Sequence, residues 1–117
     1  GNWNGRQLFD ADWIDALVTT YTPLAEMNPE KLRSGHFGYG YMWWVFDGAT
    51  HGPDYQGAYA GRGHFGNYIV VLPALEMVIS HKTWPIKYAS PEEYADVNVT
   101  WDEMQKIIDR LLAARIE

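Results

Sequence analysis

The residue types and spacing that most suggest a functional site belong to a glycine-rich segment, Gly61-Arg62-Gly63-His64-Phe65-Gly66. Its letters match the G-x-G-x-x-G fingerprint, which holds a dinucleotide pyrophosphate only where a helix N-terminus follows. Here Asn67 to Leu72 follow, and their β-branched and aromatic residues predict a strand. The segment therefore predicts no nucleotide site. Its glycines let a strand bulge or turn tightly, or let a substrate approach bare backbone.

The spacing of the histidines gives little support for a metal-binding site. The four histidines, His36, His51, His64 and His81, are scattered and form no H-E-x-x-H or other compact ligand pattern. The chain has no cysteine, which excludes disulfides and thiolate ligands. We expect neither a metal nor another cofactor.

Nucleophile signatures are also missing from the sequence. No G-x-S-x-G run occurs, and the three serines, Ser34, Ser80 and Ser90, lack a lysine three residues later. The run Asn98-Val99-Thr100 spells a glycosylation sequon, but Thr100 fits better as a helix cap. The chain by itself therefore offers no evident nucleophile.

Two helices are expected around these candidates. Apolar residues at helical spacing from Trp13 to Val18 predict a helix over about residues 11 to 20, followed by a loop that reaches Gly38. Thr100 and Glu103 form a capping box. After it the apolar stripe predicts a helix over residues 101 to 115 that lies on a sheet; its members are Trp101, Met104, Ile107, Ile108, Leu111 and Leu112.

Four strands are expected between the helices, at 39 to 46, 57 to 63, 67 to 72 and 76 to 82. The first is closed by an Asp47-Gly48 turn, and a proline-containing connection covers 84 to 98. Short links between strands indicate an antiparallel meander. The expected fold is α+β: a meander of about four strands flanked by an N-terminal and a C-terminal helix, in a single domain over residues 1–117.

The aromatic residues raise the prospect of a partner surface. Strict alternation along the first expected strand would place Tyr39, Tyr41 and Trp43 on one face, and Met42 with Trp44 on the other. Both faces would then be apolar. One of them would need a partner to cover it.

Composition excludes several classes of function. With 47% hydrophobic residues the chain should fold or associate, and its net charge of −6 with scattered basic residues disfavours nucleic acid as a partner. The longest apolar run is too short to span a membrane. The first six residues lack the layout of a signal peptide, so the protein is either cytosolic or its export signal precedes residue 1.

The segment from Gly57 to Ile79 resembles the C-terminal strands of serine β-lactamase-like hydrolases. This superfamily includes class C β-lactamases, penicillin-binding proteins, related esterases and 6-aminohexanoate-dimer hydrolases. In it a glycine-rich strand precedes Gly-polar-Tyr, an apolar strand, a proline turn and a last apolar strand. Trp3-Asn4-Gly5-Arg6-Gln7-Leu8 and Tyr39-Gly40-Tyr41-Met42-Trp43-Trp44 are similar to the family's segments as well, so the resemblance covers essentially the whole chain.

The resemblance implies acyl transfer through a serine in a Ser-x-x-Lys motif, with a Tyr-x-Asn or Tyr-x-Ser motif and a Lys-Thr-Gly-type strand. Only the strand falls within this chain. Tyr88-Ala89-Ser90 and Lys82-Thr83-Trp84 have similar letters but stand in the wrong order, and we do not carry them over. The chain is thus expected to be the C-terminal part of a hydrolase that is inactive alone.

Alignment on Gly66-Asn67-Tyr68 places Gly61-Arg62-Gly63 at the Lys-Thr-Gly strand. The family then implies that the His64 backbone amide, after Gly63, is an oxyanion-hole donor. A second frame takes His64-Phe65-Gly66 as the triad and moves the donor to Asn67. Gly61, Arg62, Phe65 and Asn67 are the implied substrate contacts. Because lysine is missing, esters or amides are favoured over lactams, although Arg62 could supply a positive charge.

Partners and location are expected only in outline. The sheet should associate with the remaining N-terminal part of the hydrolase, or with itself where that part is missing. Many members of the family are periplasmic or extracellular, and the sequence itself does not give the compartment. The alternative function is a stand-alone, non-catalytic binding or interaction module derived from the same fold. An upstream, in-frame Ser-x-x-Lys would distinguish the two.

Overall fold

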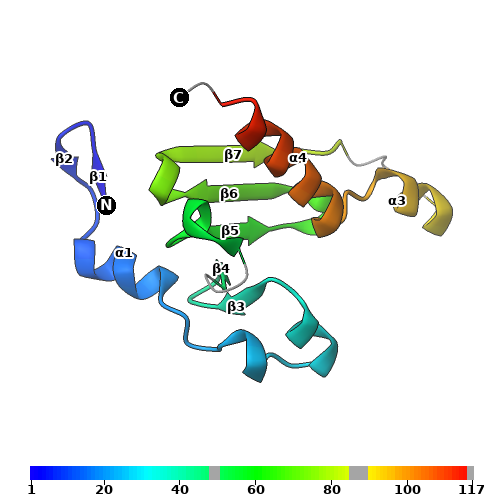
Figure 1. The fold of residues 1–117 in the computed structure, drawn as a ribbon, viewed down its shortest axis with the longest axis horizontal. Coiled ribbons are helices and arrows are strands. Elements are labelled where there is room, and N and C mark those ends of the chain that lie inside the picture. Colours follow the sequence, from blue (N-terminus) through cyan, green and yellow to red (C-terminus); the bar gives the residue numbers. More distant parts are fainter. Residues whose placement is uncertain (48–50, 85–89, 116–117) are drawn as a thin grey trace. The chain divides into compact units, whose positions relative to one another are not determined.

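The computed structural model describes residues 1–47, 51–84 and 90–115 (Figure 1). The chain divides into two compact units. The first unit comprises Gly1–Gly61 and Val70–Val78, and the second comprises Arg62–Ile69 and Ile79–Glu117. Each unit is described by itself below.

A five-stranded antiparallel sheet confirms the expected α+β class and corrects the expected number of strands. Its strands follow one another in chain order, as a meander does. They are β3 (Phe37–Tyr39), β4 (Trp44–Phe46), β5 (Tyr59–Arg62), β6 (Tyr68–Leu72) and β7 (Met77–His81). The three later strands lie close to the expected ranges.

The expected strand over residues 39 to 46 is wrong, because this segment contains a hairpin turn. β3 and β4 pair antiparallel, with Tyr39 opposite Trp44 and Phe37 opposite Phe46. The Gly40 amide donates to the Trp43 carbonyl at 2.8 Å and closes the turn. Met42 in this turn has a left-handed φ of +66°. The alternation expected for an unbroken strand is therefore wrong too. The Asp47-Gly48 turn lies partly outside the described residues.

Cross-strand aromatic pairs fill one face of the β3–β4 hairpin in the first unit. Opposite residues of an antiparallel pair project to the same face, so their rings can touch. The rings of Phe37 and Phe46 meet edge to face with centroids 4.7 Å apart. Tyr39 and Trp44 do the same at 5.1 Å. Phe37 and Phe46 are buried, so this hairpin carries part of the core.

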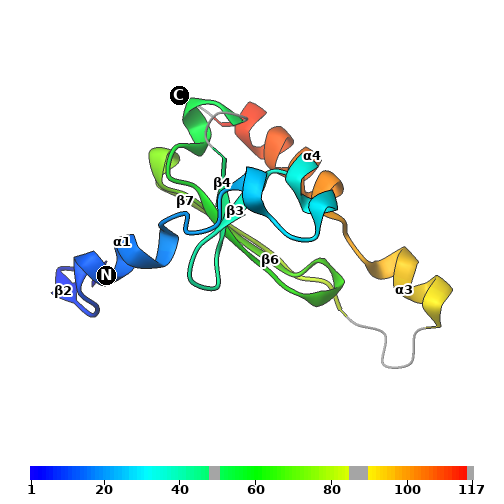
Figure 2. The same cartoon turned by 90° about the horizontal axis from the view of Figure 1, so that it is seen from below.

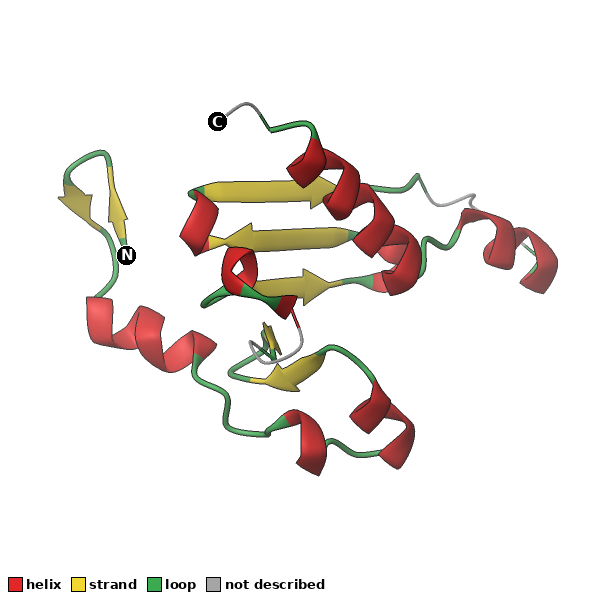
Figure 3. Ribbon diagram, viewed as in Figure 1, coloured by secondary structure: helices red, strands yellow, loops and turns green. Residues whose placement is uncertain are grey.

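The N-terminal segment forms a small hairpin and then the expected helix (Figure 3). The hairpin strands are β1 (Asn2–Trp3) and β2 (Arg6–Gln7). Helix α1 covers Ala11–Val18 and so confirms the expectation, ending two residues before residue 20. None of its residues is buried, and Trp13 stays 51% exposed. The following expected loop holds two short 3-10 turns, η1 (Leu24–Glu26) and η2 (Glu30–Ser34).

The second unit ends in two separate helices, α3 (Pro91–Val97) and α4 (Trp101–Ala113) (Figure 2). The α4 helix confirms the expected C-terminal helix and its capping box. Of the apolar stripe, Trp101, Met104 and Ile108 are buried. Ile107 and Leu111 are 36% and 44% exposed, so the expected buried stripe is too wide.

Helix α3 lies within the proline-containing connection expected over residues 84 to 98, for which no helix was predicted. Ser90 accepts a hydrogen bond from the Glu93 amide at 3.2 Å, and the Glu93 carboxylate accepts one from the Ser90 amide at 2.6 Å. This is a second capping box, here of the form Ser-x-x-Glu, with Pro91 in the favoured first helical position.

Removal of the Thr100 hydroxyl should destabilise the start of α4. Thr100 Oγ1 accepts from the Glu103 amide at 3.4 Å and donates to the Glu103 carboxylate at 2.8 Å. We expect Thr100→Ala to lower the free energy of unfolding by about 1 kcal/mol in urea titrations. Lys106→Ala, an exposed change in the middle of the same helix, is the control. Equal midpoints for both variants would contradict the capping role.

The stability that the Thr100–Glu103 cap contributes should decrease in acid. Hydrogen bonds from the Thr100 amide and hydroxyl hold the pKa of Glu103 below its ordinary value of 4.5. A carboxyl whose pKa is lowered by folding stabilises the protein above its unfolded pKa, and this contribution is lost as the pH falls through the folded pKa. Urea midpoints measured between pH 6 and pH 3 should therefore fall less steeply for Glu103→Gln than for the unmodified chain. If the urea midpoints of the two proteins fell with pH in parallel, the Glu103 carboxylate would not contribute to the loss of stability in acid.

No helix among the described residues is long and apolar enough to cross a lipid bilayer.

Candidate functional site

The implied site residues lie together on one tight connection between β5 and β6. Gly61 and Arg62 end β5, and Gly63 precedes a 3-10 turn, η4 (His64–Gly66). Asn67 then leads directly into β6. We call residues 63–67 the β5–β6 turn. The sequence therefore located the connection correctly, although it did not predict the helical turn inside it.

Two residues of the β5–β6 turn have left-handed backbone conformations. Phe65 has φ +61° and ψ +17°, and Gly66 has φ +77°. A non-glycine residue in this region costs roughly 1–2 kcal/mol, because its Cβ crowds the following carbonyl. Consecutive amides in such a turn form a concave surface that suits an anion. Strain of this kind is retained where the surroundings over-determine it.

Hydrogen bonds within the turn fix its backbone. The Gly63 amide donates to the Asn67 carbonyl at 2.7 Å, and the Asn67 amide donates to the His64 carbonyl at 3.3 Å. The Asn67 side-chain amide donates to the same His64 carbonyl at 2.6 Å. The Asn67 backbone amide, the donor in the second alignment frame, is thus committed to the turn.

The last residue of β7 and a residue just after it form hydrogen bonds to the β5–β6 turn. Thr83 Oγ1 donates to the Phe65 carbonyl at 2.7 Å, and the Thr83 amide donates to Asn67 Oδ1 at 3.1 Å. His81 Nδ1 lies 2.8 Å from the Gly66 carbonyl, so this nitrogen carries the proton. The sequence reasoning missed both residues. The run Lys82-Thr83-Trp84 drew attention to Thr83, but only as a misplaced family motif.

Gly66 packs directly against the chain before α4. A Cβ placed on Gly66 would lie 2.8 Å from Val99 Cβ and still closer to the Val99 carbonyl oxygen. The buried Tyr68 side chain donates its hydroxyl to the same carbonyl at 2.8 Å. Burial raises the pKa of Tyr68, so the phenol stays protonated and keeps donating. The turn therefore contacts both the end of β7 with the residues after it and the segment before α4.

Comparisons with protein-family models, curated proteins and solved structures found no match to this chain.

Arg62 lies against an aromatic ring in the structure. Its guanidinium lies 5.6 Å from the centre of the Trp101 ring, within the range of a cation–π contact. Partial burial lowers the pKa of Arg62, and the neighbouring Tyr68 opposes this effect. The described contact ties Arg62 to the first residue of α4. Its implied role as a substrate contact stays a prediction.

The described serine contacts belong to local structure. Ser34 donates to the Lys31 carbonyl at 3.1 Å, and Ser90 caps α3. Ser80 is exposed on β7. In residues 1–47, 51–84 and 90–115, no described hydrogen bond joins a serine hydroxyl to a lysine or histidine side chain. Tyr88 and Ala89 of the decoy run lie outside the described residues.

Two histidines form a close pair in the first unit. His36 Nδ1 and His51 Nε2 lie 3.0 Å apart, and His51 Nδ1 lies 3.1 Å from the Asp47 carbonyl. Because a carbonyl only accepts, His51 Nδ1 is the donor in the contact with Asp47. Among the residues that the structure describes, no group of three or more His, Cys, Asp or Glu side chains could hold a metal ion.

Proposed function

We propose that this chain is the C-terminal part of a serine hydrolase of the β-lactamase and penicillin-binding-protein superfamily. In this proposal the His64 backbone amide, positioned by Gly63, donates to the oxyanion of a tetrahedral intermediate. The nucleophilic serine comes from another part of the same enzyme. The substrate is an ester or amide, since Gly61 stands where the family has the lysine of Lys-Thr-Gly.

The observation that carries the proposal is the set of hydrogen bonds that hold the backbone of the β5–β6 turn. The carbonyls of His64, Phe65 and Gly66 each accept a described hydrogen bond, and the backbone of Phe65 is strained. An oxyanion hole needs donors that are fixed before the reaction, so that no reorganisation is required in the transition state. Left-handed residues also occur at Met42 and Glu76 in the other connections of the sheet, so the three hydrogen-bonded carbonyls carry this argument.

The order of elements supports the same reading. Strand β5 leads through the turn into β6, a proline-containing 3-10 turn, η5 (Pro73–Leu75), follows, and β7 comes next. This is the order in which the family arranges its glycine-rich strand, apolar strand, proline turn and last strand. A helix, α4, closes the described chain, as the resemblance implies.

The proposal is tested by the gene and by turnover together. The reading frame that encodes residues 1–117 should also encode an upstream Ser-x-x-Lys and Tyr-x-Asn or Tyr-x-Ser. The complete polypeptide should hydrolyse a chromogenic acyl ester faster than a chromogenic cephalosporin, and the 117-residue chain alone should hydrolyse neither. A complete polypeptide without these motifs, or one that turns over neither substrate, would refute the hydrolase.

Self-association of the isolated chain is a further expected result. Strand β6 exposes 48% of Ile69, and β7 exposes 65% of Val78. In a complete hydrolase the missing part would cover such apolar side chains, so the isolated chain should pair with itself. Light scattering at increasing concentration should show species larger than a monomer, with binding of an apolar dye. A monodisperse monomer without dye binding would contradict this expectation.

A non-catalytic binding module is the second candidate. The observation that favours it is the pair of exposed aromatic side chains Tyr21 and Tyr41, which are 51% and 47% exposed and whose rings stack with centroids 4.5 Å apart. In this reading the aromatic-rich sheet is the binding surface. The reading-frame test separates the two candidates, because a module needs no upstream Ser-x-x-Lys.

A further inference from the structure

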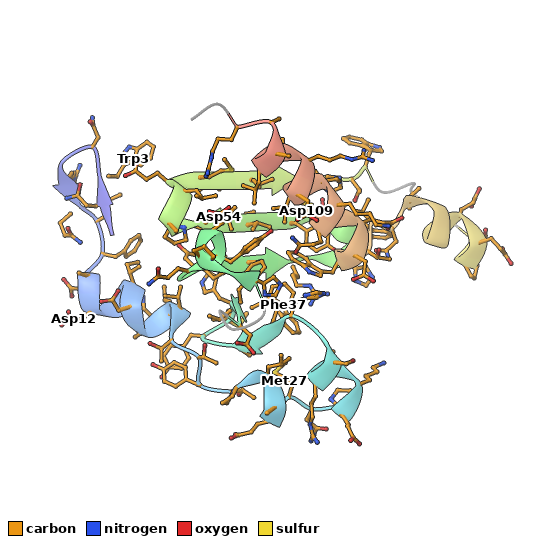
Figure 4. The ribbon with its side chains drawn as sticks, viewed as in Figure 1. Trp3, Asp12, Met27, Phe37, Asp54 and Asp109 are labelled. Atoms are coloured by element: carbon orange, nitrogen blue, oxygen red, sulfur yellow. The ribbon has the colours of Figure 1, made fainter. Side chains whose placement is uncertain are left out.

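A pocket of about 320 Å³ lies within the first unit, beside the β3–β4 hairpin. Its walls include Glu26, Met27, Leu32, Tyr39 and Trp44. Figure 4 labels Met27, in the segment that follows η1, and Phe37 on β3. Small-molecule sites range from about 300 to 1,000 Å³, so this pocket has room for a small ligand. None of its residues belongs to the β5–β6 turn.

Two aromatic residues form a corner of this pocket. Tyr39 and Trp44 are opposite each other in the β3–β4 ladder, and their rings meet at 71° with centroids 5.1 Å apart. Trp44 also meets the buried Phe37 edge to face at 6.1 Å, which fixes its orientation. Ring faces carry negative charge density and attract cations, most strongly in tryptophan.

The charges of the residues that line the pocket also favour a cation. Glu26 is the one ionisable carboxylate among the described lining residues, and none of them is lysine or arginine. Arg33 donates from Nε to the Met27 carbonyl at 2.9 Å and is not part of the lining. The whole chain has a net charge of −6, which adds a long-range attraction for cations. Met27 and Leu32 provide apolar contacts for alkyl groups.

We propose that this pocket binds a small organic cation with an alkylated ammonium group. The ammonium lies against the Tyr39–Trp44 corner, and Glu26 neutralises its charge. A quaternary ammonium suits this arrangement because it has alkyl contacts to offer and no N–H groups that need hydrogen bonds. The inference does not depend on the hydrolase proposal, since it concerns other residues of the chain.

The test compares two ligands of equal shape and different charge. Choline and its uncharged analogue 3,3-dimethylbutan-1-ol are titrated into the 117-residue chain, with calorimetry and tryptophan fluorescence as readouts. We expect choline to bind at least about fivefold more tightly, because only it carries the cation that the corner attracts. Equal affinity for the two, or no binding of choline at millimolar concentration, would overturn the proposal.

Matched variants locate the site. Glu26→Gln should weaken choline binding about threefold to tenfold at low salt, since it removes the counter-charge without changing the shape. Glu30→Gln removes an exposed carboxylate on η2 that does not line the pocket, and it should leave the affinity unchanged. Trp44→Leu should abolish the preference for choline over its analogue, whereas Trp44→Phe should retain part of it. Equal effects of Glu26→Gln and Glu30→Gln would place the cation elsewhere and refute the site.

Discussion

Replacement of His64 by proline should lower kcat of the complete polypeptide about 100-fold to 1,000-fold for its best ester substrate, which is the range observed when one oxyanion donor is removed. Proline deletes the backbone N–H and leaves the chain path possible. Gly63, the residue before it, has φ −101° and ψ 173°, which suits a residue that precedes proline.

The matched control is His64→Ala, which keeps the amide and removes the imidazole. Its kcat should stay within about threefold of the unmodified enzyme if the donor is the backbone N–H. Equal losses in both variants would assign the effect to the side chain instead. No loss in the proline variant would exclude the His64 amide as a donor, and would leave the frame with Asn67 to be tested.

Gly66→Ala should be the most destabilising single substitution in the β5–β6 turn. Its φ of +77° costs an alanine roughly 1–2 kcal/mol. The added Cβ would also meet Val99 backbone and side-chain atoms that have little room to move, and such overpacking costs a further 1–3 kcal/mol or so. We expect a total loss of about 3 kcal/mol in the free energy of unfolding.

Gly57→Ala separates the two contributions to this loss. Gly57 has φ +70°, and the nearest atom to a Cβ there, Pro73 Cγ, lies at an ordinary contact distance of 4.0 Å. Its substitution should cost only the backbone contribution of about 1–2 kcal/mol. Urea unfolding of both variants measures the difference. Equal losses would mean that Val99 yields to the methyl group and that the turn is less firmly anchored than the contacts indicate.

Local patterns predicted much of the fold. The Thr100–Glu103 capping box gave the start of α4 correctly, and β-branched residues located β6. The hairpin between β3 and β4 could not be seen, because an unbroken aromatic run hides the turn at Gly40 and Met42. Its reversal depends on a left-handed Met42, and no rule of residue preference places a methionine there.

The position of the β5–β6 turn was predictable, whereas its contacts were not. The glycines at 61, 63 and 66 predicted a tight turn in the right place. The bonds from His81 and Thr83 to this turn were not predictable, since they join residues 15 to 18 positions apart whose contact depends on the pairing of strands. The stacking of Arg62 on Trp101 was equally hidden, because the two residues meet only in the folded chain.

The most direct test of the central claim is intact-mass measurement after treatment with a serine-reactive acylating probe, on the complete polypeptide and on the 117-residue chain side by side. The account predicts one stoichiometric adduct on the complete polypeptide, at a serine outside residues 1–117, and no adduct on the shorter chain. An adduct on Ser34, Ser80 or Ser90, or no adduct on either protein, would contradict it.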